Sequence, residues 1–308
     1  MSSDDGRRGG DERQLSTRRG HVGDLVEGGA APPAVPGRTL PLRTELVRQL
    51  ERRRTQVAFA LVVAMPIILW AAFSLGGDDD GGTASGPNLV DLASGSATNF
   101  AVFTLFASAS FLLVVLVALF FGDTVAAEAS WSSLRYLLAI PVPRARLLRQ
   151  KAVVAGLLSV AALLLLPIAS LVVGAIAYGT GDLVSPVGES LPFWTAVGRV
   201  LLGALYVTVQ LSWVAGLALL LSVSTDAPLG AVGGAVMASI VSQIIDQIDD
   251  LGVIRNFLPT HYGDAWSALL ARDIDWAEMT YGAFSAVCYA TVFLGAAAWR
   301  FTRKDITS

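Results

Sequence analysis

Six long apolar runs alternate with polar segments along this chain. None of these runs contains Asp, Glu, Lys or Arg, and they cover residues 55–75, 101–121, 152–178, 200–222, 229–245 and 279–299. A helix of about 20 residues crosses the roughly 30 Å hydrocarbon layer of a bilayer, and a charge at its centre costs about 3 kcal/mol even on a lenient insertion scale. The pattern therefore predicts an all-α integral membrane protein with six transmembrane helices.

The composition supports this class. Of the 308 residues, 54% are hydrophobic and 15% are charged, and the mean hydropathy is +0.59, whereas soluble domains are about 25% charged. The net charge of -3 averages segments of opposite sign, so it indicates nothing about acidic ligands, and we expect no nucleic-acid partner. The single cysteine, Cys288, lies in an apolar run, so neither an internal disulfide nor a thiol metal cluster is expected.

The residues before the first run divide into two parts. Residues 1–39 are polar and rich in Gly, Arg and Asp, which is typical of a disordered cytosolic tail. Residues 40–54 place Leu42, Leu46, Val47 and Leu50 on one helical face and charges on the other. This pattern predicts an interfacial helix in contact with membrane lipid; a plain stop signal of arginines would not explain the apolar stripe. Residues 55–308 then form the transmembrane domain.

Basic residues predict the orientation. They precede the first run, follow the sixth as Arg300, Arg303 and Lys304, and recur between the second and third, while the opposite loops are nearly bare of them. By the positive-inside rule, both termini and residues 122–151 face the cytoplasm, as in a multi-pass protein of the plasma (inner) membrane. The loop at 246–278 is then extracytoplasmic, and its apolar residues interleaved with Gly and Pro predict short helices within it.

Polar and small residues inside the runs are candidates for packing or for a substrate path. Gly230, Gly234, Ala238 and Ser242 recur every four residues, which permits close helix packing within the chain, although a dimer contact or a translocation path stays open. An amphipathic cavity for substrate is expected from a second set, comprising Phe103, Phe106, Ser110, Gln210 and Ser242. The alternative for its polar members is hydrogen bonding to neighbouring helices.

Two other clusters have weaker interpretations. His261 and Asp264 lie in the loop at 246–278, where a lone histidine is interpreted as a surface or turn residue. The run Asp78, Asp79 and Asp80 lacks the bidentate glutamate of a calcium loop and is interpreted as solvated linker.

The polar segment at residues 122–151 has the most distinctive pattern. It reads GDTVAAEASWSSLRYLLAIPVPRARLLRQK, and at helical spacing it places an apolar stripe beside a polar one that contains Glu128, Ser132 and Arg135. Pro141 and Pro143 prevent the helix from continuing, and basic residues follow. The pattern predicts a short helix at the membrane surface that is offered to a soluble partner.

This segment resembles the second cytoplasmic feature of ABC-2 type transporter permeases. That pattern has a glutamate, a Gly-Thr pair, a Leu-Leu pair, a proline, an arginine and a lysine. Without a gap, the matching positions here are Glu128, Leu137, Leu138, Pro141, Arg144 and Lys151. Ser132 and Ser133 replace the Gly-Thr pair, which keeps two small polar residues.

The resemblance implies a transmembrane subunit of an ABC exporter of the ABC-2 type, in which this segment is a coupling helix. It implies two partners, an ABC ATPase subunit that holds ATP and Mg²⁺ and a second permease subunit. The residues it assigns to coupling are Glu128, Trp131, Ser132, Leu134, Arg135, Leu138, Pro141, Arg144 and Lys151. The chain contains no G-x-x-x-x-G-K-[ST] phosphate loop, so we expect no ATPase site and no cofactor in the chain itself.

Other classes of membrane protein fit the sequence less well. A secondary transporter usually places Asp, Glu or His within its spans, and these runs have none. An intramembrane enzyme needs a nucleophile with an adjacent base or a metal, and the chain has only two His and one Cys. A membrane anchor that recruits an ATPase without moving a substrate stays open.

Overall fold

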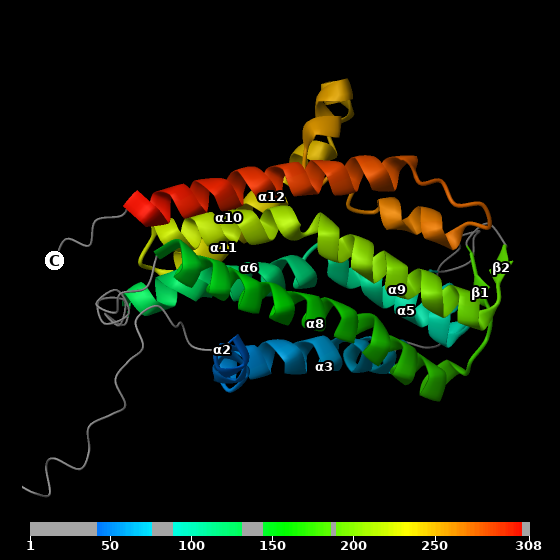
Figure 1. The fold of residues 1–308 in the computed structure, drawn as a ribbon. Helices are drawn as coiled ribbons and strands as arrows, with labels where there is room; N and C mark the ends of the chain where they lie inside the picture. The colour runs from blue at the N-terminus through cyan, green and yellow to red at the C-terminus, as the bar shows by residue number, and fades with distance from the viewer. Residues whose placement is uncertain (1–41, 76–88, 131–143, 186–188, 304–308) are drawn as a thin grey trace, which may run out of the picture. The chain divides into compact units, whose positions relative to one another are not determined.

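The computed structural model describes residues 42–75, 89–130, 144–185 and 189–303 (Figure 1). All of them belong to the second of two units, residues 39–308. The predicted tail at residues 1–39 and the Asp78–Asp80 linker lie outside the described residues. So does most of the predicted coupling segment, residues 122–151, which is called the coupling segment below.

The described residues are almost entirely helical, with two short 3-10 helices and two two-residue strands. The α-helices are α2 (Leu42–Leu50), α3 (Arg53–Leu75), α4 (Leu89–Ser94), α5 (Ala97–Ala109), α6 (Leu112–Ser130), α8 (Arg144–Tyr178), α9 (Phe193–Gln210), α10 (Ser212–Ser224), α11 (Pro228–Asp246) and α12 (Ala277–Arg303). The 3-10 helices η2 (Asp249–Phe257) and η3 (Ala265–Leu270) lie between α11 and α12. Strands β1 (Leu183–Val184) and β2 (Ser190–Leu191) pair antiparallel.

The predicted all-α membrane fold is confirmed. Five helical stretches are long and apolar enough to cross a bilayer, namely α3, α8, α9 with α10, α11 and α12, and the pair α5 and α6 makes a sixth when counted as one span. Pro66 in α3 and Pro167 in α8 do not end their helices, which is common in membrane helices because neighbouring groups satisfy the freed backbone.

The second apolar run differs from its expected form. Instead of one straight helix over 101–121, it consists of α5 and α6, bent by 55° at Ser110 and Phe111. The fourth span changes direction less, at Leu211 between α9 and α10. Neither break contains Gly or Pro, so packing against the other helices, rather than local sequence, determines them.

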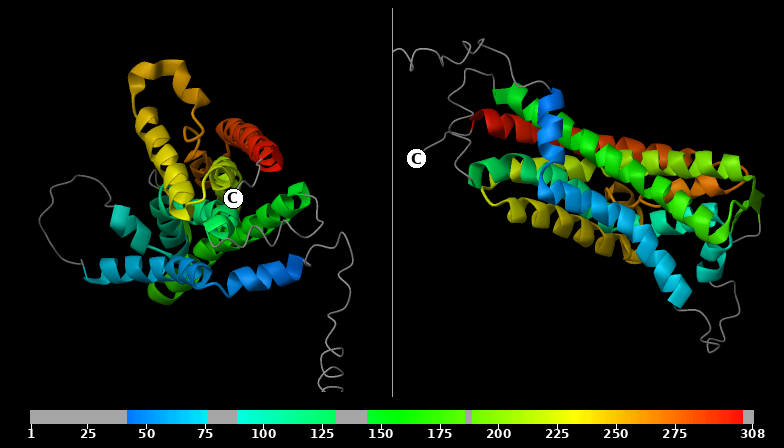
Figure 2. Two further views of the ribbon diagram at one scale, coloured as in Figure 1. Left: turned by 90° about the vertical axis from the view of Figure 1, so that its left-hand side faces the viewer. Right: turned by 90° about the horizontal axis from the view of Figure 1, so that it is seen from below.

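Helix α10 lies at the centre of the packing. It contacts α6, α11 and α12, while α8 packs against α3, α5, α6 and α9 (Figures 1 and 2). Small side chains allow these helices to come close: a Cβ on Gly216 of α10 would lie 3.1 Å from the carbonyl oxygen of Ala290 on α12. Large apolar side chains on α3, α8 and α12 point outward, including Ile67, Ile176 and Phe284, as expected for a surface that faces lipid.

Candidate functional site

The structure describes the two ends of the coupling segment. Residues 122–130 belong to α6 and residues 144–151 to α8. The side chains of Glu128 and Arg144, and the whole of Trp131, Ser132, Leu134, Arg135, Leu138 and Pro141, lie outside the described part of the chain. Lys151 is fully described.

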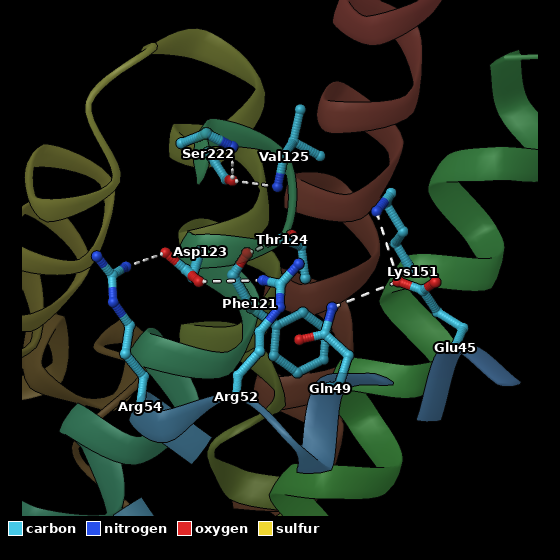
Figure 3. A network of polar contacts seen from close by, with 11 residues as sticks. Glu45, Gln49, Arg52, Arg54, Phe121, Asp123, Thr124, Val125, Lys151 and Ser222 are labelled. Atoms are coloured by element: carbon cyan, nitrogen blue, oxygen red, sulfur yellow. Dashed lines mark hydrogen bonds and ion pairs between the residues drawn. The ribbon is translucent and has the colours of Figure 1, made fainter. Parts of the chain in front are cut away.

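At the first end of the segment, Asp123 binds two arginines from the start of α3 and the turn before it. Its carboxylate oxygens lie 2.7 Å from the Arg54 guanidinium and 3.5 Å from that of Arg52 (Figure 3). Arg54 is largely exposed and Asp123 is mostly buried. The contact therefore attaches the C-terminal half of α6 to the first turn of α3 and to the turn before it.

At the second end, Lys151 forms an ion pair with Glu45 of α2. Its ammonium nitrogen lies 3.7 Å from Glu45 Oε1, and the two side chains are only 6% and 7% exposed. Gln49 donates a 3.4 Å hydrogen bond to the same oxygen (Figure 3). Lys151 thus contacts a partner within the chain, and α2 with the start of α3 binds both ends of the coupling segment.

The burial of residues in α2 differs from what its sequence pattern predicts. The helix forms where the pattern predicts it, but Glu45 is its buried residue, while Leu42, Val47 and Leu50 are exposed. Leu46, the fourth member of the predicted apolar stripe, is partly buried and packs against the core. Three of the four stripe residues are thus left exposed by the described protein, and the interfacial role itself stays a prediction.

A third contact joins α6 to α10. The Ser222 hydroxyl accepts hydrogen bonds from the backbone N–H groups of Val125 and Ala126, at 3.1 and 3.0 Å. Ser222 is fully buried, and the donors lie within the coupling segment. Movement of that segment would therefore act directly on α10, the central helix of the bundle.

Replacing Ser222 with alanine should lower the free energy of unfolding by about 1 kcal/mol, because two buried N–H groups lose an acceptor. Thermal unfolding of the purified protein measures this. Ser224→Ala is the matched control, since that hydroxyl donates only to Leu220 of its own helix. Equal effects of the two substitutions would show that the α6–α10 contact contributes nothing.

A polar cavity of about 160 Å³ lies where several helices end. Its wall includes residues at the ends of α5 (Ala109 and Ser110), α9 (Gln210) and α11 (Gln243 and Asp246). The loop residues Pro259, Thr260, His261, Gly263 and Asp264 complete it. The bends at Ser110 and Leu211 are part of this wall, so the breaks in the second and fourth spans create the cavity.

The expected substrate-path residues are divided between this cavity and other places. Ser110 and Gln210 line it, and Ser242 is hydrogen-bonded at 2.7 Å to Thr260, which also lines it. The aromatic members lie elsewhere: Phe103 packs against Phe73, and Phe106 packs against Trp266. The structure therefore brings together the polar members of the set.

Hydrogen bonds hold the cavity wall together. Gln210 Nε2 donates to the carbonyl oxygen of Pro259 at 2.6 Å, and Gln243 Nε2 donates to that of Ser110 at 3.0 Å. The breaks and the loop leave these two backbone carbonyl groups without a helical N–H partner. Amide side chains from α9 and α11 donate to them instead.

His261 and Asp246 form a pair that the surface interpretation of His261 did not include. His261 Nδ1 lies 2.7 Å from Asp246 Oδ1, and Arg255 Nε lies 3.6 Å from the same oxygen. Asp264 also lines the cavity, and burial raises the pKa of its carboxyl. The pairing of Asp246 joins positions 15 residues apart through an irregular loop, so no regular spacing in the sequence indicates it.

The stripe of small residues on α11 is only partly used in packing. A Cβ on Gly234 would lie 2.9 Å from Leu221 of α10, whereas one on Gly230 would meet only its own helix and the turn before it. The fully buried face is one residue further along, at Ala231, Ala235 and Ser239. Ala238 is half-buried beside it.

Within the described ranges, no group of three His, Cys, Asp or Glu side chains is placed so that it could hold a metal ion. The polar network at the ends of the coupling segment and the cavity are thus the two features of the described structure that suggest a function. The polar network could transmit a movement between helices, and the cavity could bind a small ligand.

Comparison with known proteins identifies the family. A family model described as "ABC-2 family transporter protein" matches residues 42–225, from the start of α2 to the end of α10. A search of curated proteins finds no match. The matched range includes every residue of the network that binds the coupling segment. Because the match covers more than half of the chain, the protein is a member of the ABC-2 transporter family, as the resemblance of residues 128–151 predicted.

Proposed function

We propose that this protein is the permease subunit of an ATP-driven exporter, and that residues 122–151 couple it to a separate ATPase subunit. The observation that carries this proposal is the attachment of both ends of that segment to α2 and α3, through Asp123 and Lys151. These ion pairs link the segment to α2 and α3, so a displacement of the segment would be passed to those helices.

The proposed mechanism starts on the partner. An ATPase subunit holds ATP and Mg²⁺, and closure of a pair of such subunits pushes on residues 122–151 of each permease. The push reaches α2 through Lys151 and α10 through Ser222. Because α10 contacts α6, α11 and α12, its shift rearranges the spans and changes access to an amphipathic substrate such as a lipid, drug or peptide.

The partners follow from this mechanism. Two permease subunits, identical or related, provide one pathway, and two ATPase subunits bind at the side that carries residues 122–151. In a plasma (inner) membrane, both termini would face the cytoplasm. Co-expression with the ATPase subunit should give a complex that survives purification, and a chain that never co-purifies with it would contradict the proposed assembly.

Glu128→Gln and Arg144→Ala should each uncouple ATP hydrolysis from transport, because they remove the charged residues of the docking pattern. We expect transport per ATP hydrolysed to fall about tenfold or more, the change that corresponds to 1.4 kcal/mol of lost interaction. The measurement uses the full complex in proteoliposomes. Arg300→Ala, an exposed cation of α12, is the control and should behave as wild type. Wild-type coupling in both variants would contradict the role of this segment.

A further inference from the structure

The polar cavity offers acceptors to a ligand, whereas several of its donors are already used. Gln210 is 4% exposed, and its Oε1 is buried with no hydrogen-bond partner among the described residues. The Nε2 atoms of Gln210 and Gln243 donate to Pro259 and Ser110, and His261 Nδ1 is engaged by Asp246. A buried acceptor without a partner costs free energy unless a bound molecule satisfies it.

The charges of the cavity wall also favour a ligand that is cationic. Two carboxylates, Asp246 and Asp264, line the cavity. Asp246 is paired with His261 and Arg255, but no cation is paired with Asp264 among the described residues. Asp264 is exposed, but neighbouring protein atoms partly desolvate its carboxyl and raise its pKa, so a cation bound beside it would favour the charged form.

The size and remaining walls indicate what kind of cation fits. A cavity of about 160 Å³ is close to one that holds a benzene-sized molecule, and it is smaller than the roughly 300–1,000 Å³ of a drug-sized pocket. Val114, Val207 and Trp213 supply apolar surface to the same cavity. The cavity therefore suits a charged head group with a short apolar portion.

We propose that this cavity binds the ammonium group of an organic amine, with Asp264 as its counter-ion and Gln210 Oε1 as a hydrogen-bond acceptor. The proposal rests on the proposed transport function and narrows it, because the amphipathic substrate would then be a cationic amine.

The test uses three probes of matched shape: benzylammonium, benzyl alcohol and benzoate. Binding to the full chain in detergent micelles is measured by ligand-observed NMR titration, with protein-free micelles as the blank. We expect benzylammonium to bind at least about threefold more tightly than the other two, since an ion pair with an exposed carboxylate gives a difference of this order. Preference for benzoate or benzyl alcohol, or no binding above the blank, would overturn the proposal.

Variants assign the binding to this cavity. Asp264→Asn should raise the dissociation constant of benzylammonium about threefold, and Asp264→Glu should restore most of the affinity. Asp250→Asn is the matched control, because Asp250 lies in the same connection but does not line the cavity. Equal binding by the Asp264→Asn and Asp250→Asn proteins would overturn the assignment. Because the assay needs no ATPase subunit, its failure would leave the proposed coupling untouched, and failed coupling would leave the binding result standing.

Discussion

Replacing Lys151 with methionine should lower the free energy of unfolding by about 3 kcal/mol, because the buried carboxylate of Glu45 would lose the buried one of its two cations. Both side chains are more than nine-tenths buried, so water cannot replace the lost partner. Arg48 and Gln49 also contact Glu45, which keeps the loss at the lower end of the range for broken buried pairs. Denaturant unfolding of the purified protein in micelles measures it.

The control is Arg149→Met, which removes an exposed cation from the same turn of α8 and should change stability by no more than about 0.5 kcal/mol. Combining Glu45→Gln with Lys151→Met should recover about half of the loss or more, because the isolated charge is removed as well. A Lys151→Met protein as stable as wild type would show that this pair does not hold α2 to α8.

The spans could be predicted because their signal is local. Each of the six apolar runs is long enough to cross a bilayer without help from other segments, and five helical stretches with the bent pair α5 and α6 occupy them. The bend itself was not predictable, because LFASASFLL around Ser110 contains no residue that breaks a helix. Packing of α5 against α8, and of α6 against α10 and α11, overrides the uniform helical preference of that run.

The contacts at the candidate site depend on distant pairs, which a single sequence does not reveal. Asp123 pairs with Arg54, 69 residues away, and Lys151 pairs with Glu45. Both carboxylates are visible in the sequence: Asp123 follows the second apolar run after one glycine, and Glu45 lies in the amphipathic segment at residues 40–54. The resemblance selected Lys151 as a docking residue, and only the fold shows its buried contact with α2.

The cavity, too, could be predicted only in part from the sequence. Ser110 and Gln210 were candidates because polar groups inside apolar runs are rare, and both do line it. Nothing in the sequence distinguishes Gln243, near the end of its run, or Asp246, just after that run, because polar residues are expected there. Their importance arises from the ends of α5, α9 and α11 meeting at one place, which depends on the bend at Ser110.

Replacing Gly122 with alanine should destabilise the protein, although alanine is the better helix former. A Cβ at Gly122 would lie 2.9 Å from Val232 Cγ2 and 3.2 Å from the Val232 backbone nitrogen, so α6 and α11 would have to separate. Overpacking of this kind costs about 1–3 kcal/mol, against a gain of about 1 kcal/mol in helix propensity. Because Gly122 begins the coupling segment, the separation would also displace its first end.

Gly156→Ala provides the matched comparison for this contact. Gly156 lies inside α8, and its nearest neighbour would be the Phe121 ring at 3.8 Å, an ordinary contact distance. The same substitution there should stabilise the protein by up to about 1 kcal/mol, so the two variants should differ by about 2 kcal/mol in denaturant unfolding. Adding Val232→Ala to Gly122→Ala relieves the side-chain contact but not the backbone one, so it should restore only part of the difference. Equal stability of the two alanine variants would mean that α6 and α11 are not held together at Gly122.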